Sequence, residues 1–310
     1  MRNARGSRSG VGQILDCLNK MILVIQRFVV IEICYIFVKK NMMIMKRLLI
    51  LAIPFALLSF HGCDEGKINF FTVDQDIQFG KQLDSAILAD PVNYPILSPE
   101  MYPDAYEHMY RIRDKILESK KFRYAQRFDW EVKIIHKDDV LNAFAAPGGY
   151  MYFYTGLIRF LDDESQFAGV VGHEMAHADR RHSTEMLTKQ YGFSMLAGII
   201  LGDNPTVLEN IIADLALGLG TLKYSRNNEY EADEYAVKYL YDTDYHPLGV
   251  AGFFQKLEGS PTPPEFLSTH PSPENRIEAI NKVWQSLGGK VGQTFPERYQ
   301  EFKNCLPPIN

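Results

Sequence analysis

A pair of histidines separated by three residues is the clearest sign of chemistry in this sequence. His173-Glu174-Met175-Ala176-His177 places both imidazoles on one face of a helix, where both can contact a single metal ion. Glu174 is rotated by about 100° from His173, close enough to hold a water on that metal. The preceding residues 165–172 contain no proline and supply apolar side chains for burial. We therefore predict a metal-binding helix with His173 and His177 as ligands and Glu174 as the catalytic base.

A hydrolytic zinc ion takes three protein ligands and leaves a fourth position open for water, so a third ligand must lie elsewhere in the chain. Glu229 and Asp233 are four residues apart and share one face of a helix expected over 226–241. We expect Glu229 to be the third ligand. Asp233 is expected to accept a hydrogen bond from the non-ligating nitrogen of one zinc histidine, which fixes its tautomer and orientation.

Ideal helical geometry leaves two neighbouring polar residues outside this site. His182 comes five residues after His177, off the metal-binding face, and we expect it in solvent. Glu231 points about 200° away from Glu229 and is expected on the solvated face of its helix or beside Arg226.

The elements that must position these residues are mostly helical in pattern. Alternating residues from Asp129 onward and the aromatic run Tyr150–Tyr154 predict two short strands, with a turn at Pro147-Gly148-Gly149 between them. Helices around one short block of strands indicate the α+β class, with a small antiparallel sheet beside the active-site helix. The spacing of apolar residues predicts helices over 74–88, 104–119, 163–189, 206–223, 226–241, 247–258 and 273–285.

The N-terminal region has the parts of an export signal. Lys46 and Arg47 precede an apolar run from Leu48 to Phe60, which Gly62-Cys63 follows. The run is 13 residues long, too short to span a bilayer as a helix. Cys63 directly after Gly62 resembles a bacterial lipoprotein signal, in which that cysteine is acylated. A plain secretory signal or an uncleaved anchor is the alternative.

A second apolar stretch, Met21–Val38, comes before this signal and is interrupted by Arg27 and Glu32. We interpret residues 1–44 as an extension before a true start at Met45; the alternative is a transmembrane helix. The expected organisation is an extension over 1–44, a signal peptide over 45–62, a linker over 63–73, a metallopeptidase domain over 74–290 and a C-terminal tail over 291–310.

Composition and charge exclude several classes of protein. Apolar residues make up 46% of the chain and charged residues 23%, as in globular rather than disordered proteins. Residues 63–310 hold 24 basic and 36 acidic residues, and a body this acidic is a poor general binder of nucleic acid. Four cysteines, two of them in the basic N-terminal stretch, provide no disulfide framework.

Four motifs in order resemble metallopeptidase family 48, the gluzincin group that includes the CAAX prenyl endopeptidases, the bacterial heat-shock membrane protease and periplasmic lipoprotein proteases. The motifs are NAFAAPGGY from Asn142 to Tyr150, HEMAH, YSRNNEYEAD ending at Asp233, and THPSPENRI from Thr269 to Ile277. The resemblance covers about Asp74 to Ile280. Because the several membrane helices of the prenyl-endopeptidase branch and room for a helical-repeat domain are lacking, the chain is most similar to the compact lipoprotein branch.

The resemblance implies a mainly helical, zincin-type domain that holds one Zn²⁺ at His173, His177 and Glu229. It also implies that His270 can approach the zinc and hold the enzyme latent, with Arg276 nearby. Both are candidate donors to the tetrahedral oxygen, together with a nearby tyrosine. The alternatives are a structural loop residue for His270 and a surface ion pair for Arg276.

The substrate is expected to bind as an added strand, through main-chain pairing that requires little sequence preference. One candidate is the segment Asn142, Ala143, Phe144, Ala145 and Ala146. The other is Tyr150–Tyr154, although core packing explains its tyrosine stripe better.

The expected function is a zinc-dependent endopeptidase of the bacterial cell envelope that degrades misfolded or misassembled proteins. Zinc lowers the pKa of its water to about 7, and Glu174 takes the proton as that water attacks the peptide carbonyl. The expected location is periplasm-facing, with a lipid anchor on the membrane, and nucleic acid is not an expected partner. The rival hypothesis is a chaperone or assembly factor in which His270 fills the fourth position of a latent zinc site.

Overall fold

The computed structural model describes residues 63–64, 67–200, 205–218, 223–258, 265–271 and 275–309. The chain separates into two units, residues 1–72 and 73–310, and each is described by itself. In the first unit, strand β1 (Cys63–Asp64) pairs antiparallel with strand β2 (Lys67–Ile68). The expected extension over 1–44 and signal peptide over 45–62 lie outside the described residues. Within the part of the chain described here, no helix is both long and apolar enough to cross a bilayer.

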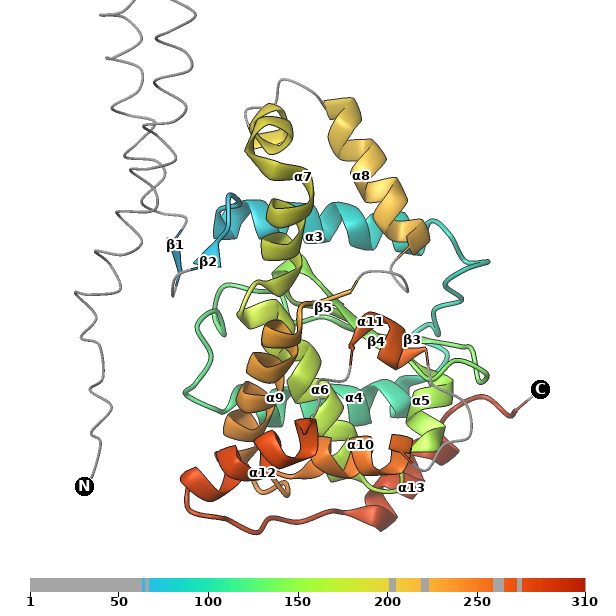
Figure 1. Ribbon diagram of the computed structural model, residues 1–310. Coiled ribbons are helices and arrows are strands. Elements are labelled where there is room, and N and C mark those ends of the chain that lie inside the picture. Colours follow the sequence, from blue (N-terminus) through green and yellow to red (C-terminus); the bar gives the residue numbers. More distant parts are fainter. Residues whose placement is uncertain are drawn as a thin grey trace, which may run out of the picture. The chain divides into compact units, whose positions relative to one another are not determined.

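The second unit is predominantly helical, and most of its helices lie where the apolar spacing predicts them (Figure 1). The first two expected helices are α3 (Val73–Leu88) and α4 (Pro103–Leu117). Later ones are α8 (Pro205–Gly218), α9 (Arg226–Tyr241), α10 (Gly249–Glu258) and α12 (Arg276–Ser286). Other helices are too short for their apolar residues to show a period: α5 (Thr155–Phe160), α11 (Phe266–Thr269) and α13 (Pro296–Asn304).

The strands of this unit are β3 (Val132–Ile135), β4 (Ala143–Ala146) and β5 (Tyr150–Tyr154), in the order β3-β5-β4. The α+β class is confirmed, but the expectation of an antiparallel sheet is wrong for one pair, because β5 runs parallel to β3 and antiparallel to β4. The chain reverses after β3 and again at the 3₁₀ turn Pro147–Gly149. This second reversal inserts β5 between its neighbours and restores the direction of β3.

Helix α6 (Glu164–Asp179), which carries the predicted metal-binding residues, lies at the centre of the packing in this unit (Figure 1). The Asp163 side chain caps its N-terminus by accepting a hydrogen bond from the Gln166 amide at 3.0 Å. Helices α4, α9 and α10 and strand β4 pack around it. Gly169 permits the close approach of α10, since a Cβ there would lie 2.2 Å from the Val250 amide nitrogen. Close packing on all sides holds the α6 side chains in defined positions.

A buried carboxylate anchors the start of α6. Glu164 accepts two hydrogen bonds from Arg111 of α4, at 2.6 and 2.8 Å, and two from Arg298 of α13, at 2.9 and 2.6 Å. Tyr245, in the segment before α10, donates a further one. Burial raises the pKa of Glu164, but the hydrogen bonds from the two arginines outweigh it and hold that pKa below its ordinary value. These contacts fix the helix that carries the site to elements far from it in the sequence.

The helix expected over 163–189 is divided in the structure, so that expectation is wrong. Helix α6 ends at Asp179, and α7 (His182–Ile200) begins after a break at Arg180 and Arg181. Arg181 has the left-handed backbone angle φ = 58°, and its buried guanidinium pairs with Asp76 of α3. This ion pair offsets the roughly 1–2 kcal/mol that a left-handed residue costs. The break changes the direction in which the first side chains of α7 point.

Candidate metal centre

The two histidines of α6 face each other inside the protein, as their spacing predicts. The Nε2 atoms of His173 and His177 lie 3.0 Å apart, and both side chains are completely buried. Two unprotonated ring nitrogens at this distance repel each other unless a proton or a cation lies between them. The pair is therefore arranged as a cation site.

Glu229 reaches the same point from α9. That helix begins at the N-cap Ser225, whose hydroxyl accepts a hydrogen bond from the Asn228 amide at 3.2 Å. Glu229 is fully buried, and its carboxylate oxygens lie 3.5 Å from His173 Nε2 and 3.5 Å from His177 Nε2. The structure thus brings together the three residues predicted as ligands, from two helices about 50 residues apart in the chain.

Asp233 and Arg276 form the next layer behind these ligands. Asp233 Oδ1 lies 3.0 Å from His173 Nδ1, the nitrogen that faces away from the cluster. Arg276, the first residue of α12, donates to Asp233 Oδ1 at 2.8 Å and pairs with Glu229 Oε2 at 2.9 Å. Its guanidinium lies over the ring of Phe254, 3.8 Å from the centroid. The surface ion pair considered for Arg276 is wrong, because the residue is 3% exposed.

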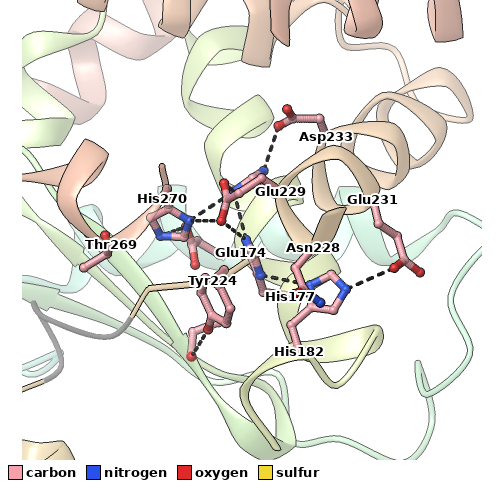
Figure 2. A network of polar contacts seen from close by, with 12 residues as sticks. Glu174, His177, His182, Tyr224, Asn228, Glu229, Glu231, Asp233, Thr269 and His270 are labelled. Atoms are coloured by element: carbon pink, nitrogen blue, oxygen red, sulfur yellow. Dashed lines mark hydrogen bonds and ion pairs between the residues drawn. The ribbon is translucent and has the colours of Figure 1, made fainter. Parts of the chain in front are cut away.

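His270 supplies a fourth donor atom. It follows α11, and its Nδ1 lies 3.3 Å from His173 Nε2 and 3.3 Å from Glu229 Oε1. The ring stacks on Phe266, with centroids 4.2 Å apart. Its other nitrogen, Nε2, lies 3.4 Å from a carboxylate oxygen of Glu174. Figure 2 shows His270 beside Glu229 and Glu174.

These residues fit a zinc ion. Among the residues that the structure describes, His173, His177, Glu229 and His270 form one group whose donor atoms all lie within 4.8 Å of one another. Ligand atoms about 2.0–2.2 Å from a tetrahedral zinc lie ~3.3 Å apart, close to the separations of 3.0 to 3.5 Å found here. Glu229 Oε1 is buried and makes no hydrogen bond within the described residues. Two imidazoles with a carboxylate are also the donor types that zinc takes in hydrolytic sites.

Glu174 lies at the edge of this group with both carboxylate oxygens buried and without a hydrogen bond to any described residue. Burial raises its pKa above the ordinary value, and the neighbouring His270 and His173 oppose that shift only in part. A carboxylate with a raised pKa is suited to accept and return a proton near neutral pH. The structure thus places Glu174, for which the HEMAH motif predicts the role of base, beside the candidate donors.

Burial and the neighbouring charges shift the pKa values of the three candidate ligands in different directions. Burial lowers the pKa of His173, but hydrogen bonds and charges from Asp233 and Glu229 outweigh it and raise that pKa to about 9. Burial and the neighbouring His173 hold the pKa of His177 well below its ordinary value. Burial raises the pKa of Glu229, yet the charge of His270 and a hydrogen bond from His173 bring it well below the ordinary range. Without metal, His173 therefore holds a proton next to the ionised Glu229, whereas His177 is neutral; a bound cation would take the place of that proton.

His182 is not in solvent, so that expectation is wrong, and Glu231 is only partly exposed, with 16% of its side chain accessible. His182 is fully buried, with its Nδ1 3.0 Å from His177 Nδ1 and its Nε2 3.2 Å from Glu231 Oε2. Figure 2 shows its ring between His177 and Glu231. Glu231 also accepts a hydrogen bond from Arg180 at 2.8 Å. The break at Arg181 turns the first side chain of α7 back toward α6, which the spacing in a continuous helix does not indicate.

Tyr224 covers the opposite side of His177. The two rings stack with centroids 3.9 Å apart, and Tyr224 is buried. Its hydroxyl lies 2.9 Å from the Ser183 hydroxyl and 3.4 Å from the main-chain oxygen of Ala145 in β4. A nearby tyrosine was one expected donor to the tetrahedral oxygen, but the Tyr224 hydroxyl contacts Ser183 of α7 and Ala145 of β4.

Of the two segments considered for binding an extended peptide, Tyr150–Tyr154 is excluded. It forms β5, the central strand, whose main-chain groups pair on both sides. Strand β4 is at the edge of the sheet and packs against α6. Asn142 precedes it, fully buried, and its Nδ2 atom has no hydrogen-bond partner among the described residues.

Comparison with known proteins agrees with this geometry. A family model described as peptidase family M48 matches residues 106–283, more than half of the chain. The beta-barrel assembly-enhancing protease of Escherichia coli (strain K12) is 33% identical over 162 residues, which cover 48% of this chain and 33% of that protein. The mitochondrial metalloendopeptidase OMA1 of Arabidopsis thaliana is 32% identical over 159 residues, 51% of this chain and 32% of that protein.

A human relative, metalloendopeptidase OMA1, is 28% identical over 199 residues, which cover 59% of this chain and 36% of that protein. The chain thus spans about a third of the length of the curated relatives it matches. The family and the relatives support a metalloendopeptidase. With the family model covering the site and both packed helices that build it, the chain belongs to peptidase family M48, whose members are metallopeptidases that use zinc.

Proposed function

We propose that this chain is a zinc-dependent endopeptidase in which His173, His177 and Glu229 hold the metal. The observation that carries the proposal is the meeting of these three buried donors beside Glu174, a buried carboxylate without a hydrogen bond to any described residue. When bound, zinc supplies a Lewis acid and a water whose pKa is about 7. The protein residues orient that chemistry and move its protons.

Glu174 is proposed as the general base. It accepts a proton from the attacking water and later delivers it to the leaving amine. Burial raises its pKa above the ordinary value, which makes it a stronger base toward the water than an exposed carboxylate would be. The contact of 3.4 Å between His270 Nε2 and Glu174 Oε1 occupies the carboxylate side that a water would need, so this contact must open during a cycle.

Arg276 and His270 are proposed as donors to the oxygen of the tetrahedral intermediate. Arg276 uses Nε and Nη2 to hold Asp233 and Glu229, whereas its Nη1 is buried without a hydrogen-bond partner among the described residues. Buried donors that are fixed before the reaction stabilise developing negative charge effectively. Asp233 has the separate role of holding His173 in the tautomer that presents Nε2 to the metal.

We place the substrate peptide along the edge strand β4, at Asn142, Ala143, Phe144 and Ala145. Main-chain pairing to an edge strand binds an extended peptide with little sequence preference. The Nδ2 of Asn142, which has no partner among the described residues, is a suitable donor to a peptide carbonyl at the start of this strand. Because the hydroxyls of Ser183 and Tyr224 each lie 3.4 Å from Ala145 O, a bound peptide would replace these two weak contacts.

The physiological substrates proposed are misfolded or misassembled proteins of the bacterial cell envelope. Relatives named beta-barrel assembly-enhancing protease support this class of substrate. The lipoprotein-like signal that ends at Cys63 supports an anchored, periplasm-facing location. A Cys63→Ala variant should then move from the membrane fraction to the soluble envelope fraction. An unchanged distribution would contradict lipid anchoring and favour Met21–Val38 as the anchor.

Glu174→Gln tests the catalytic assignment. The variant should bind zinc at one ion per chain, as the parent does, and lose cleavage of an unfolded protein substrate. Glu234→Gln is the matched control, since Glu234 lies on the exposed side of α9 and pairs with Lys238; it should cleave normally. Turnover retained in the Glu174 variant would exclude this residue as the base.

A second candidate function is favoured by the position of His270. Its Nδ1 completes a set of four donors, which would leave no position for water and make a latent zinc protein that acts as a chaperone or assembly factor. The variant His270→Ala separates the two functions. A gain of peptide hydrolysis supports a peptidase held latent by this residue. If neither parent nor variant hydrolyses peptides while both bind zinc, the binding function is favoured.

A further inference from the structure

Three polar side chains beside the cluster belong to neither the proposed ligands nor the proposed base. They are Arg180, His182 and Glu231, here named the His182 relay. Arg180 Nε donates to Glu231 Oε1 at 2.8 Å, Glu231 Oε2 lies 3.2 Å from His182 Nε2, and His182 Nδ1 lies 3.0 Å from His177 Nδ1 (Figure 2). Arg180 is further held over the ring of Tyr235, 4.3 Å from the centroid.

The chemistry of the relay determines where its protons lie. A carboxylate only accepts hydrogen bonds, so the ring nitrogen of His182 that faces Glu231 must carry hydrogen. When His182 is neutral, this is its single ring proton, and its Nδ1 is an acceptor. The contact of 3.0 Å between the two Nδ1 atoms then requires that His177 Nδ1 is the donor. His177 Nε2 is left with its lone pair directed into the metal cluster.

The relay repeats for His177 what Asp233 does for His173, with one imidazole inserted. Both acids come from α9, two and four residues after Glu229, and each is paired with an arginine. Asp233 reaches its histidine directly at 3.0 Å. Glu231 points to the other side of the helix and reaches His177 through the His182 ring, which the break at Arg181 brings back toward α6.

We propose that the His182 relay is a positioning device for zinc binding, in which Glu231 acts through His182 to fix the tautomer and ring orientation of His177. His182 and Glu231 are thus positioning residues and do not touch substrate. This inference rests on the proposed function, because it takes His177 as a zinc ligand. Outer partners of this kind typically change metal affinity by about 10–100-fold.

Zinc affinity of the full chain, measured by competition with a chromophoric chelator, tests the proposal. His182→Phe keeps an aromatic ring at this position but removes both ring nitrogens, and the Kd for zinc should rise about 10–100-fold. Glu231→Ala should have a similar effect, whereas Glu231→Gln keeps an acceptor for His182 and should recover most of the affinity. Nitrogen-15 chemical shifts of the metal-free protein should show hydrogen on His177 Nδ1 in the parent and a mixture of tautomers in Glu231→Ala.

Tyr239→Phe is the matched control, since it removes a buried hydrogen bond of 2.9 Å to Asp179, also between α9 and α6, without contacting a histidine. It should lower thermal stability and leave zinc affinity unchanged. Zinc binding within twofold of the parent in both His182→Phe and Glu231→Ala would overturn the relay, and so would an equal loss of affinity in Tyr239→Phe. If the parent chain itself binds no zinc, the proposed function fails, which is a different result.

Discussion

Replacing Arg276 by methionine should destabilise the metal-free protein and, at the same time, make zinc bind more tightly. Methionine keeps an unbranched side chain of similar length over Phe254 but removes the charge and all donors. Arg276 is 3% exposed and makes contacts of 2.9 Å to Glu229 and 2.8 Å to Asp233. Its Nη2 also lies 3.4 Å from His173 Nε2, so Arg276 contacts two of the groups that zinc would use.

The expected loss of folding stability, and the expected gain in zinc affinity, follow from these contacts. Removing one partner of a buried ion pair destabilises a protein by about 3–5 kcal/mol, because the other charge is left uncompensated. Without zinc, two carboxylates lose their cation. With zinc bound, the ion neutralises Glu229, and only Asp233 loses a partner while keeping its contact with His173. If zinc offsets half of the loss, roughly 2 kcal/mol, it must bind the variant about 30-fold more tightly than the parent.

Urea unfolding gives the free energy of unfolding of the metal-free and zinc-loaded forms, and competition with a chelator gives the Kd for zinc. These three quantities, measured for the parent and the variant, form a complete thermodynamic cycle. Arg276→Lys is the control: it keeps the charge and loses the planar fork, so its metal-free stability should lie between those of the parent and Arg276→Met. Hydrolysis should fall in Arg276→Met even though zinc binds more tightly, if Nη1 serves the tetrahedral oxygen. Weaker zinc binding, or equal destabilisation of both forms, would refute this account of Arg276.

Three other expectations concern the scaffold and pH. Glu164→Gln should destabilise the protein by about 2–4 kcal/mol, less than a fully buried pair because both arginines are one-third exposed. The folded pKa of Glu164 is lowered, so its contribution is present above the unfolded pKa and lost as pH falls through the folded one; the variant should show a flatter acid limb in urea unfolding at pH 3–6. Because His173 without metal has a pKa raised to about 9, zinc must displace its proton, and calorimetric affinity should rise roughly tenfold per pH unit between pH 6.5 and 9. Gly169→Ala should lower the thermal midpoint and cost about 1–3 kcal/mol or more, since its Cβ would meet the α10 backbone at 2.2 Å.

The parts of the site that depend on one helix at a time were predictable from spacing. His173 and His177 share a face because they are four residues apart in α6, and Glu229 and Asp233 do so in α9. The distance between the two helices has no local signature. It follows from the close packing of α6 on α9, where a Cβ at Gly172 would lie 3.0 Å from Leu240 Cδ1. The two helices were expected to meet only because a zinc site needs a third ligand.

The break between α6 and α7, which the spacing of residues could not indicate, depends on one residue with a left-handed backbone. Arg181 adopts φ = 58° because its side chain is buried in an ion pair with Asp76, about a hundred residues away. A sequence window around α6 contains nothing of that partner, so a continuous helix is the best local interpretation. Because of the break, His182 lies against His177 instead of in solvent, and its other ring nitrogen contacts Glu231 of α9. The parallel β3–β5 pair was missed for a similar reason, since strand order is a long-range property.

The four donor groups differ in how firmly the surrounding protein holds them. His173, His177 and Glu229 each contact a polar side chain outside the cluster, which orients them from behind. His270 differs in its outer partner, which is the proposed base: its Nε2 lies 3.4 Å from Glu174 Oε1 and makes no hydrogen bond within the described residues. Hydrolysis requires one tetrahedral position to be free for water. If His270 moved away, it would free one of the four donor positions and uncover the side of Glu174 that faces its ring, which is the movement that a peptidase held latent by His270 would need.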